Sequence, residues 1–220
     1  MKIDARMSRR ILMTFFGVTV CGASVSLFKM AAFGVDPFQT LMAGLDFVIP
    51  LSFGLLYVIV NALLLTFSLI FDRTRIGLGT FMNLFLCGYI TQFCYGGLLA
   101  AFPSPSLPLR ILFLVLGIVI MCFASAFYMT ADLGVSTYDA VAIVMSGKWK
   151  MGKFKIVRIC TDLVCVLLGT LIFLLGGGSW QTILASVGIG TIVTAFFMGP
   201  LIQFFNDTVA IPFLEKASGK

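Results

Sequence analysis

Apolar residues fall into six stretches of this chain, each about as long as a membrane-spanning helix. The stretches are 11–33, 53–71, 76–102, 111–131, 156–175 and 182–205. A helix needs about 20 predominantly apolar residues to cross the ~30 Å hydrocarbon core of a bilayer. Two shorter segments, 37–49 and 136–147, reach only about 20 Å at ~1.5 Å of rise per residue. The pattern predicts an all-α polytopic membrane protein with about six transmembrane helices and two short re-entrant or interfacial helices.

The two halves of the chain share residues at fixed spacings. Identical residues recur 100 positions apart at Arg10/Arg110, Gly17/Gly117 and Gly34/Gly134, and 111 positions apart at Gly77/Gly188, Gly79/Gly190 and Thr80/Thr191. We interpret them as an internal duplication, about 10–102 and 110–205, within a single membrane domain 1–220 that ends in a short polar tail, 206–220. Two similar sets of apolar helices are typical of secondary transporters.

The positions of basic residues bear on how the chain threads the membrane. If the short segments span, there are eight crossings and the halves are parallel; if they do not, there are six, and the second half is inverted. The segment 34–52 has no Lys or Arg and the turn 72–75 has two, whereas the loop 148–158 has five and the turn 176–180 has none. Since cytoplasmic loops carry the basic residues, this swap favours 3+3 inverted repeats with both termini cytoplasmic. Total counts of basic residues barely distinguish six crossings from eight.

Composition excludes several classes of protein. With 60% hydrophobic and 11% charged residues and a mean hydropathy of +1.10, the chain is not a soluble domain. The net charge of +6 does not indicate a nucleic-acid partner, because the basic residues cluster at the ends of apolar segments. There is no histidine, and the six cysteines lie within apolar segments without CxxC spacing. We expect no metal, no cofactor and no enzymatic activity.

The candidate binding site lies at two interruptions that follow Gly34 and Gly134. After the first, Asp36 is placed to cap a helix that begins at Pro37. After the second, Ser136-x-x-Asp139 resembles a capping box. Broken helices at matching positions in two halves indicate a transporter's binding site, and their N–H groups suit an anion or polar headgroup. The alternative is that the two glycines only end helices in a left-handed conformation.

Polar residues inside apolar segments extend this candidate site. Asp162 has Asn61 as its counterpart in the first half, and Asp139 has Gln39. Intramembrane ionisable residues are costly and are often functional, although Asp162 can equally form a structural pair with Arg158 one turn earlier. Lys29 can snorkel or pair with a carboxylate. The predicted substrate-binding residues are Asp36, Gln39, Asn61, Ser136, Tyr138, Asp139 and Asp162.

The glycine blocks have a simpler explanation than a binding site. Gly77-x-Gly79-Thr80 and its twin, Gly188-x-Gly190-Thr191, fall within the predicted apolar helices. Small residues there let helix backbones approach closely, so we predict a packing role.

The chain resembles the YitT/YczE/YyaS group of bacterial integral membrane proteins, most closely its short YczE-type members. The blocks that carry the resemblance are 33–38, 52–54 and 76–80 in the first half and 133–139, 151–152 and 189–191 in the second. The resemblance implies a multi-pass protein of the bacterial cytoplasmic membrane with duplicated helices, and it implies no particular substrate.

Two hypotheses of function follow. The first is a secondary transporter or permease-like protein for a small anionic or amphipathic solute, within the lipid bilayer. The second is a non-transporting scaffold or regulator that binds a cytoplasmic protein partner through the basic loop 148–158, although that loop suits anionic lipid headgroups as well. The sequence fixes neither the solute nor the oligomeric state.

Overall fold

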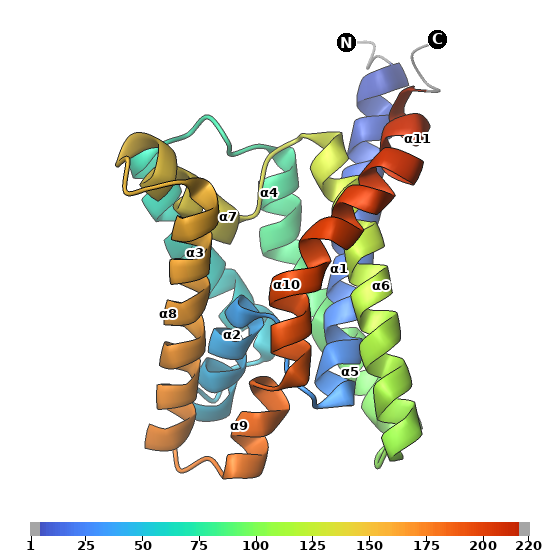
Figure 1. Ribbon diagram of the computed structural model, residues 1–220, viewed down its shortest axis with the longest axis vertical. Coiled ribbons are helices and arrows are strands. Elements are labelled where there is room, and N and C mark those ends of the chain that lie inside the picture. Colours follow the sequence, from blue (N-terminus) through green and yellow to red (C-terminus); the bar gives the residue numbers. More distant parts are fainter. Residues whose placement is uncertain (1–4, 216–220) are drawn as a thin grey trace.

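The computed structural model describes residues 5–215, except for the side chains at positions 5, 155, 182, 195 and 196. Helices make up nearly all of this range (Figure 1). In chain order they are α1 (Ala5–Ala31), α2 (Pro37–Val48), α3 (Phe53–Phe71), α4 (Leu78–Met82), η1 (Asn83–Cys87), α5 (Gly88–Ala101), α6 (Leu107–Ala131), α7 (Thr137–Ile143), η2 (Val144–Lys148), α8 (Phe154–Leu175), α9 (Trp180–Ser186), α10 (Ile189–Phe205), η3 (Asn206–Ala210) and α11 (Ile211–Glu215). The three η segments are π-helical turns.

Within the described residues, five helices are long and apolar enough to cross a membrane. They are Arg6–Ala31, Phe53–Phe71, Leu78–Ala101, Leu107–Ala131 and Ile156–Leu175. A sixth span is present if the pair Ile183–Thr194 and Phe197–Glu215, bent by 55°, counts as one. The short helices α2 and α7 are not among them. For the described residues, the prediction of an all-α protein is confirmed, with five to six apolar helices long enough to span a bilayer and short helices at α2 and α7.

The short helices begin as the sequence predicts. The Asp36 carboxylate accepts a hydrogen bond from the Gln39 N–H at 3.2 Å, and Pro37 occupies the first turn of α2. At α7 the Ser136 hydroxyl accepts a bond from the Asp139 N–H at 3.1 Å. The Asp139 side chain differs from that of a full capping box, because it accepts from the Ser136 hydroxyl at 2.6 Å instead of from the Ser136 backbone.

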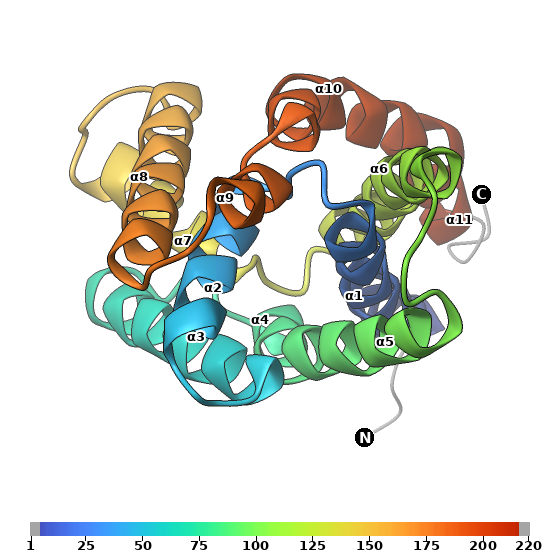
Figure 2. The same cartoon turned by 90° about the horizontal axis from the view of Figure 1, so that it is seen from below.

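Close approach between helices depends on glycine in two places. The long helices α1 and α6 lie against each other, and a Cβ at Gly17 would lie 2.8 Å from the Ala124 carbonyl oxygen. Between α2 and α8, a Cβ at Gly44 would lie 2.7 Å from the Gly169 carbonyl oxygen, and a Cβ at Gly169 would lie 2.6 Å from that of Thr40. Seen end-on, α2 accordingly stands inside the bundle, next to α3 and α8 (Figure 2).

The bundle has two unlike ends. One end of the bundle holds four features: the start of α1, the turn between α3 and α4, the loop that precedes α8, and helix α11 (Figure 1). The other end holds the turns that follow α5 and α8. Two contacts hold the first end together: Arg9 donates to the Phe213 carbonyl at 3.0 Å, and Lys148 donates to the Phe71 carbonyl. We call this the basic end, because it carries Arg6, Arg9, Arg10, Arg73, Arg75, Lys148, Lys150 and Lys153.

Two expectations from the sequence need correction. The tail predicted at 206–220 is helical as far as Glu215, and Thr130 of α6 anchors it by donating to the Asn206 side chain at 2.7 Å; residues 216–220 lie outside the described part. The glycine blocks lie only partly inside helices: Gly79 belongs to α4 and Gly190 to α10, but the first glycine of each block does not. Gly77 and Gly188 are the N-caps of α4 and α10, because at both points the chain turns to meet the opposite half.

Candidate functional site

The first interruption, after α1, is held by backbone contacts with the start of α10. The N–H groups of Gly34 and Val35 donate to the carbonyls of Ala185 and Ser186 at 3.0 and 3.1 Å, and the Gly190 N–H donates to the Phe33 carbonyl at 2.6 Å. Gly34 has φ +102°, and a Cβ there would lie 2.6 Å from the Gly188 nitrogen. Glycine is required here for both reasons.

The second interruption, after α6, makes the corresponding contacts with the start of α4. The Val135 N–H donates to the Arg75 carbonyl at 3.1 Å, and the Gly79 N–H donates to the Leu133 carbonyl at 2.7 Å. Gly134 has φ +118°, and a Cβ there would lie 2.7 Å from the Gly77 nitrogen. The glycine blocks therefore let the backbone of one half of the chain contact the backbone of the other, which is the close packing that the sequence predicts for them.

The left-handed helix stops lie two residues before these glycines. Ala32 and Asp132 have φ of 51° and 48°, directly after the last residues of α1 and α6. The alternative that Gly34 and Gly134 merely end helices in that conformation therefore does not describe the structure.

An arginine from the other half caps each of these helix ends. Arg110 donates to the carbonyls of Ala31 and Ala32 at 2.8 and 2.9 Å. Arg10 donates to the carbonyl of Ala131 at 2.6 Å and to that of Asp132. Carbonyls at a helix C-terminus lack intrahelical partners, so each guanidinium satisfies two of them.

The two short helices meet inside the bundle. Figure 1 shows that α2 and α7 both begin within the bundle and not at its ends. The rings of Phe38 and Tyr138, one from each first turn, stack with centroids 5.0 Å apart. Of the predicted site, Asp36, Gln39, Ser136, Tyr138 and Asp139 are thus carried on two helix starts in direct contact.

A charged cluster surrounds Tyr138. Arg158 of α8 pairs with Asp139 and lies 3.3 Å from Asp162, and its guanidinium sits 4.2 Å from the centroid of the Tyr138 ring. The Tyr138 hydroxyl donates to Asp162 at 2.7 Å. Asp36, the N-cap of α2, interacts electrostatically with both Arg158 and Asp162. We call Asp36, Tyr138, Asp139, Arg158 and Asp162 the central cluster.

Two other predicted residues lie beside the central cluster and not within it. Asn61 of α3 is 1% exposed; it accepts a hydrogen bond from the Thr137 hydroxyl and donates to the Tyr57 carbonyl at 2.8 Å. Gln39 is 7% exposed, and none of the described side chains forms a hydrogen bond with its side-chain amide. Asn61 thus ties α3 to α7, and Gln39 holds a polar group in the interior.

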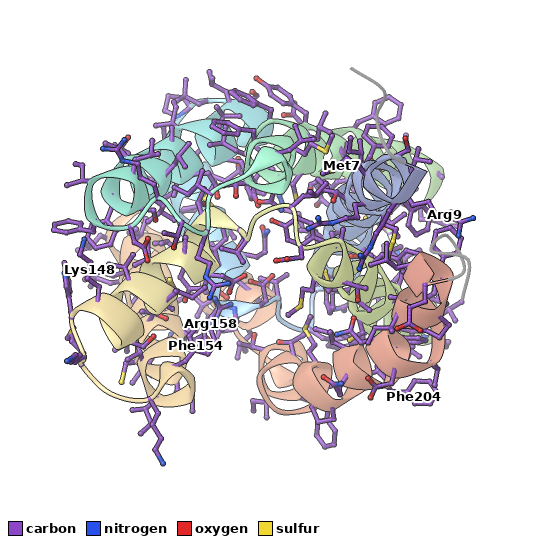
Figure 3. All side chains as sticks on the ribbon, turned by 90° about the horizontal axis from the view of Figure 1, so that it is seen from above. Met7, Arg9, Lys148, Phe154, Arg158 and Phe204 are labelled. Carbon is purple, nitrogen blue, oxygen red and sulfur yellow. The ribbon has the colours of Figure 1, made fainter. Side chains whose placement is uncertain are left out.

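Sequence reasoning underrated Arg158. It was considered as a partner of Asp162 and as part of the basic loop, but the structure also pairs it with Asp139, 19 residues away. Figure 3 shows Arg158 pointing toward the centre of the bundle, whereas Lys148 lies at its edge. The spacing to Asp162 was the one available signal, because side chains four apart on a helix are neighbours. The Lys29 pair is with Asp46, at 3.7 Å.

The charges of the central cluster do not balance. The guanidinium of Arg158 forms ion pairs with two carboxylates, Asp139 and Asp162, and Asp36 adds a third carboxylate that is not ion-paired with it. The side chains of the two ion pairs are partly exposed, at 31% for Arg158, 40% for Asp139 and 25% for Asp162. Surplus negative charge at membrane depth is costly unless a proton, a cation or water compensates it. The arrangement therefore suits protons or cationic groups better than a free anion.

Comparisons with known proteins agree on a relationship but attach no activity to it. Residues 8–207 match the model of a family of unknown function, DUF6198. An uncharacterized protein of Haemophilus influenzae is 26% identical over 207 residues, which cover 92% of this chain and 85% of that protein. No solved structure matches the chain. Because the family model covers nearly all of the described helices, the chain belongs to the DUF6198 family of unknown function.

Proposed function

We propose that this protein is a secondary transporter or permease-like protein, and not an enzyme, that moves a small solute past the central cluster. The observation that carries the proposal is the meeting of α2 and α7, each of which follows an interrupted helix and begins against the other at Phe38 and Tyr138. Interrupted helices in matching positions are the feature from which transporter binding sites are built.

The proposal includes 3+3 inverted repeats. It is supported by pairs of equivalent contacts: Arg10 with Ala131 and Arg110 with Ala31, and Gly79 with Leu133 and Gly190 with Phe33. Phe38 and Tyr138 are one hundred positions apart and touch each other, as residues near a two-fold axis do. Kinship with the YitT/YczE/YyaS group is part of the proposal and rests on the sequence blocks alone.

The proposed orientation places the basic end in the cytoplasm of a bacterium, with both termini on that side. The positive-inside rule supports it, because eight Lys and Arg side chains lie at this end. Arg110 and the turn after α8, which has no basic residue, would then lie on the outer side.

The charges of the central cluster support a different class of solute from the one that the sequence indicates. The sequence favoured a small anionic or amphipathic solute, on the basis of helix N-termini. Three carboxylates against one guanidinium oppose a free anion there. We propose an amphipathic solute with a cationic or protonated group, or movement coupled to protons, with Asp162 as the carboxylate that exchanges partners.

An uptake assay tests this proposal. Purified protein reconstituted in liposomes is supplied with a library of labelled metabolites, with and without a pH gradient. We expect saturable uptake that Asp162→Asn reduces by at least about tenfold, because it removes a charge from the pathway. Asp207→Asn is the matched control, since Asp207 is exposed on η3 and should transport normally.

The assay also separates the two hypotheses. No flux for any solute, together with a soluble protein that co-purifies and is lost on substituting Lys150 and Lys153, would favour the scaffold. Equal flux in Asp162→Asn and wild type would remove the central cluster from the pathway while leaving transport in place.

The orientation has a separate test by cysteine accessibility in intact cells, in a background without native cysteines. Ser104→Cys should react with an impermeant reagent from outside, and Arg73→Cys and Met151→Cys only after permeabilisation. Reaction of Arg73→Cys from outside would contradict the inverted topology.

A further inference from the structure

A pocket of about 660 Å³ lies at the end of the bundle opposite the basic end, between the last turn of α1, α5, the start of α6 and α9. Its polar side chains are Lys29, Tyr95, Arg110 and Gln181, and its walls include Phe33, Leu99 and Leu184. No residue that lines it is acidic. We call it the Arg110 pocket. It is distinct from the central cluster, with which it shares no residue.

The two cations of this pocket stand apart from the basic end. The other basic side chains that the structure describes belong to the basic end or, like Arg158, to the central cluster near it. Lys29 and Arg110 lie toward the opposite end, where the positive-inside rule disfavours basic residues. Because both Lys29 and Arg110 depart from this rule and line the same pocket, we look for their role in the pocket itself.

Arg110 has no counterion among the described residues. Its contacts are the neutral carbonyls of Ala31 and Ala32 and the face of the Phe33 ring, 4.5 Å from its centroid. Lys29 is only loosely paired, with its Nζ 3.7 Å from Asp46 and over the ring of Phe53. The pocket therefore carries surplus positive charge, and the guanidinium retains N–H groups beyond the two that meet carbonyls.

The equivalent arginine shows what is missing. Arg10 makes the same pair of carbonyl contacts at the end of α6, and its guanidinium also lies 3.5 Å from the Asp132 carboxylate. The residue one hundred positions before Asp132 is Ala32, with the same left-handed backbone. An alanine stands beside Arg110 where a carboxylate stands beside Arg10.

We propose that the Arg110 pocket binds an amphipathic molecule with an anionic head, a phosphate or a carboxylate. The head contacts Arg110 and Lys29, because guanidinium groups bind oxyanions in a planar fork and ammonium groups bind them as point charges. The tail lies along Leu99 and Leu184, which are 44% and 61% exposed. The ligand is either a phospholipid of the bilayer or a free amphipathic acid.

The test supplies the missing carboxylate. Binding of dioctanoyl phosphatidylglycerol, decyl phosphate and dioctanoyl phosphatidylcholine is measured by thermophoresis on the full chain in a neutral detergent. We expect wild type to prefer one or both anionic probes over the zwitterionic one. Ala32→Asp should weaken that binding at least about tenfold, because its carboxylate cancels the surplus positive charge beside Arg110 and also repels an anionic head.

The matched control is Ala32→Asn, which has the same shape and tolerates the left-handed backbone but carries no charge. It should bind as wild type does. A second variant, Lys29→Gln, should also weaken binding, and size-exclusion profiles report whether each variant folds. A preference for phosphatidylglycerol identifies a bilayer lipid, and a preference for decyl phosphate identifies a free acid.

Two outcomes would overturn the proposal. One is wild-type binding without preference for anionic heads; the other is equal binding by Ala32→Asp and Ala32→Asn. Because the assay needs no gradient and no flux, failure of transport does not affect it, and failure of binding here leaves the transport proposal standing.

Discussion

The two halves of this protein place similar backbone contacts beside different side chains. Positions with identical residues in both halves make backbone contacts that hold the helix interruptions, namely Arg10/Arg110, Gly34/Gly134, Gly77/Gly188 and Gly79/Gly190. Positions that differ carry charges in the second half: Ala32/Asp132, Gln39/Asp139 and Asn61/Asp162. The second half holds most of the central cluster, and the first half contributes neutral groups and Asp36.

The comparison indicates that, in this fold, the backbone contacts at the interruptions can stay the same while the charged side chains beside them differ. Residues that only satisfy backbone groups are constrained to one identity, because a left-handed or tightly packed backbone admits few others. A side chain that points from the same frame into the interior is free to differ. Several of the differences between the halves therefore lie where charged side chains pair, at Asp132, Asp139 and Asp162.

The largest expected effect tests whether the helix interruptions at Gly34 and Gly134 are equivalent. Gly34→Ala and Gly134→Ala should each destabilise the protein by about 3 kcal/mol or more, because each adds both a backbone clash and a strained conformation. The measurement is the fraction of monodisperse protein that survives heating. Gly97→Ala is the control, since a Cβ there meets nothing within 4 Å. Loss of stability in only one of the pair would break the comparison.

The variants Asn61→Asp and Asp162→Asn should have the next largest effect on stability. The loss should be larger for Asn61→Asp. Asn61→Asp places a carboxylate beside the Tyr57 carbonyl at a site that is 1% exposed, and we expect a loss of about 2 kcal/mol. Asp162→Asn keeps the shape at a partly exposed site, so its stability should change by less than about 1 kcal/mol. Thermal unfolding in detergent measures both. Equal losses would mean that the two positions are equally buried in solution.

A smaller effect is expected for Tyr138→Phe, which makes the stacked pair symmetric. It removes the hydrogen bond from the hydroxyl to Asp162 but keeps the ring contact with Phe38, and we expect a loss of about 1 kcal/mol. Phe38→Leu is the contrasting variant, because it removes the stacking and leaves the hydroxyl bond. If Tyr138→Phe costs nothing, water replaces the hydroxyl at Asp162 and the cluster is open to solvent.

The smallest effect belongs to Asp132→Ala, which gives the second half the residue of the first. Its carboxylate is 85% exposed and 3.5 Å from Arg10, so stability should fall by no more than about 0.5 kcal/mol. Melting temperatures at low and high salt check this, and the difference from wild type should shrink as salt rises. A loss of several kcal/mol would show that Asp132 is needed to hold the end of α6.

Features of the fold that depend on neighbours along the chain were predictable. The apolar segments, the short helices at 37–49 and 136–147, and the capping roles of Asp36 and Ser136 follow from local hydrophobicity and hydrogen bonding. The order of the two interruptions followed from the repeated residues. The helical continuation of the chain to Glu215 was missed, because polar composition alone does not show that α6 supplies a partner for Asn206.

The sequence by itself determined that this is a helical membrane protein with two interrupted helices, because the cost of exposing backbone to lipid leaves few other structures for such a composition. Only the tertiary structure decided which groups meet there. Arg158 of α8 pairs with Asp139 of α7, and Gly134 in the second half packs against Gly77 in the first. Helix packing brings these residues together although they are far apart along the chain. The absence of a carboxylate beside Arg110 has the same origin: its meaning depends on the carbonyls and the pocket that surround the guanidinium in three dimensions.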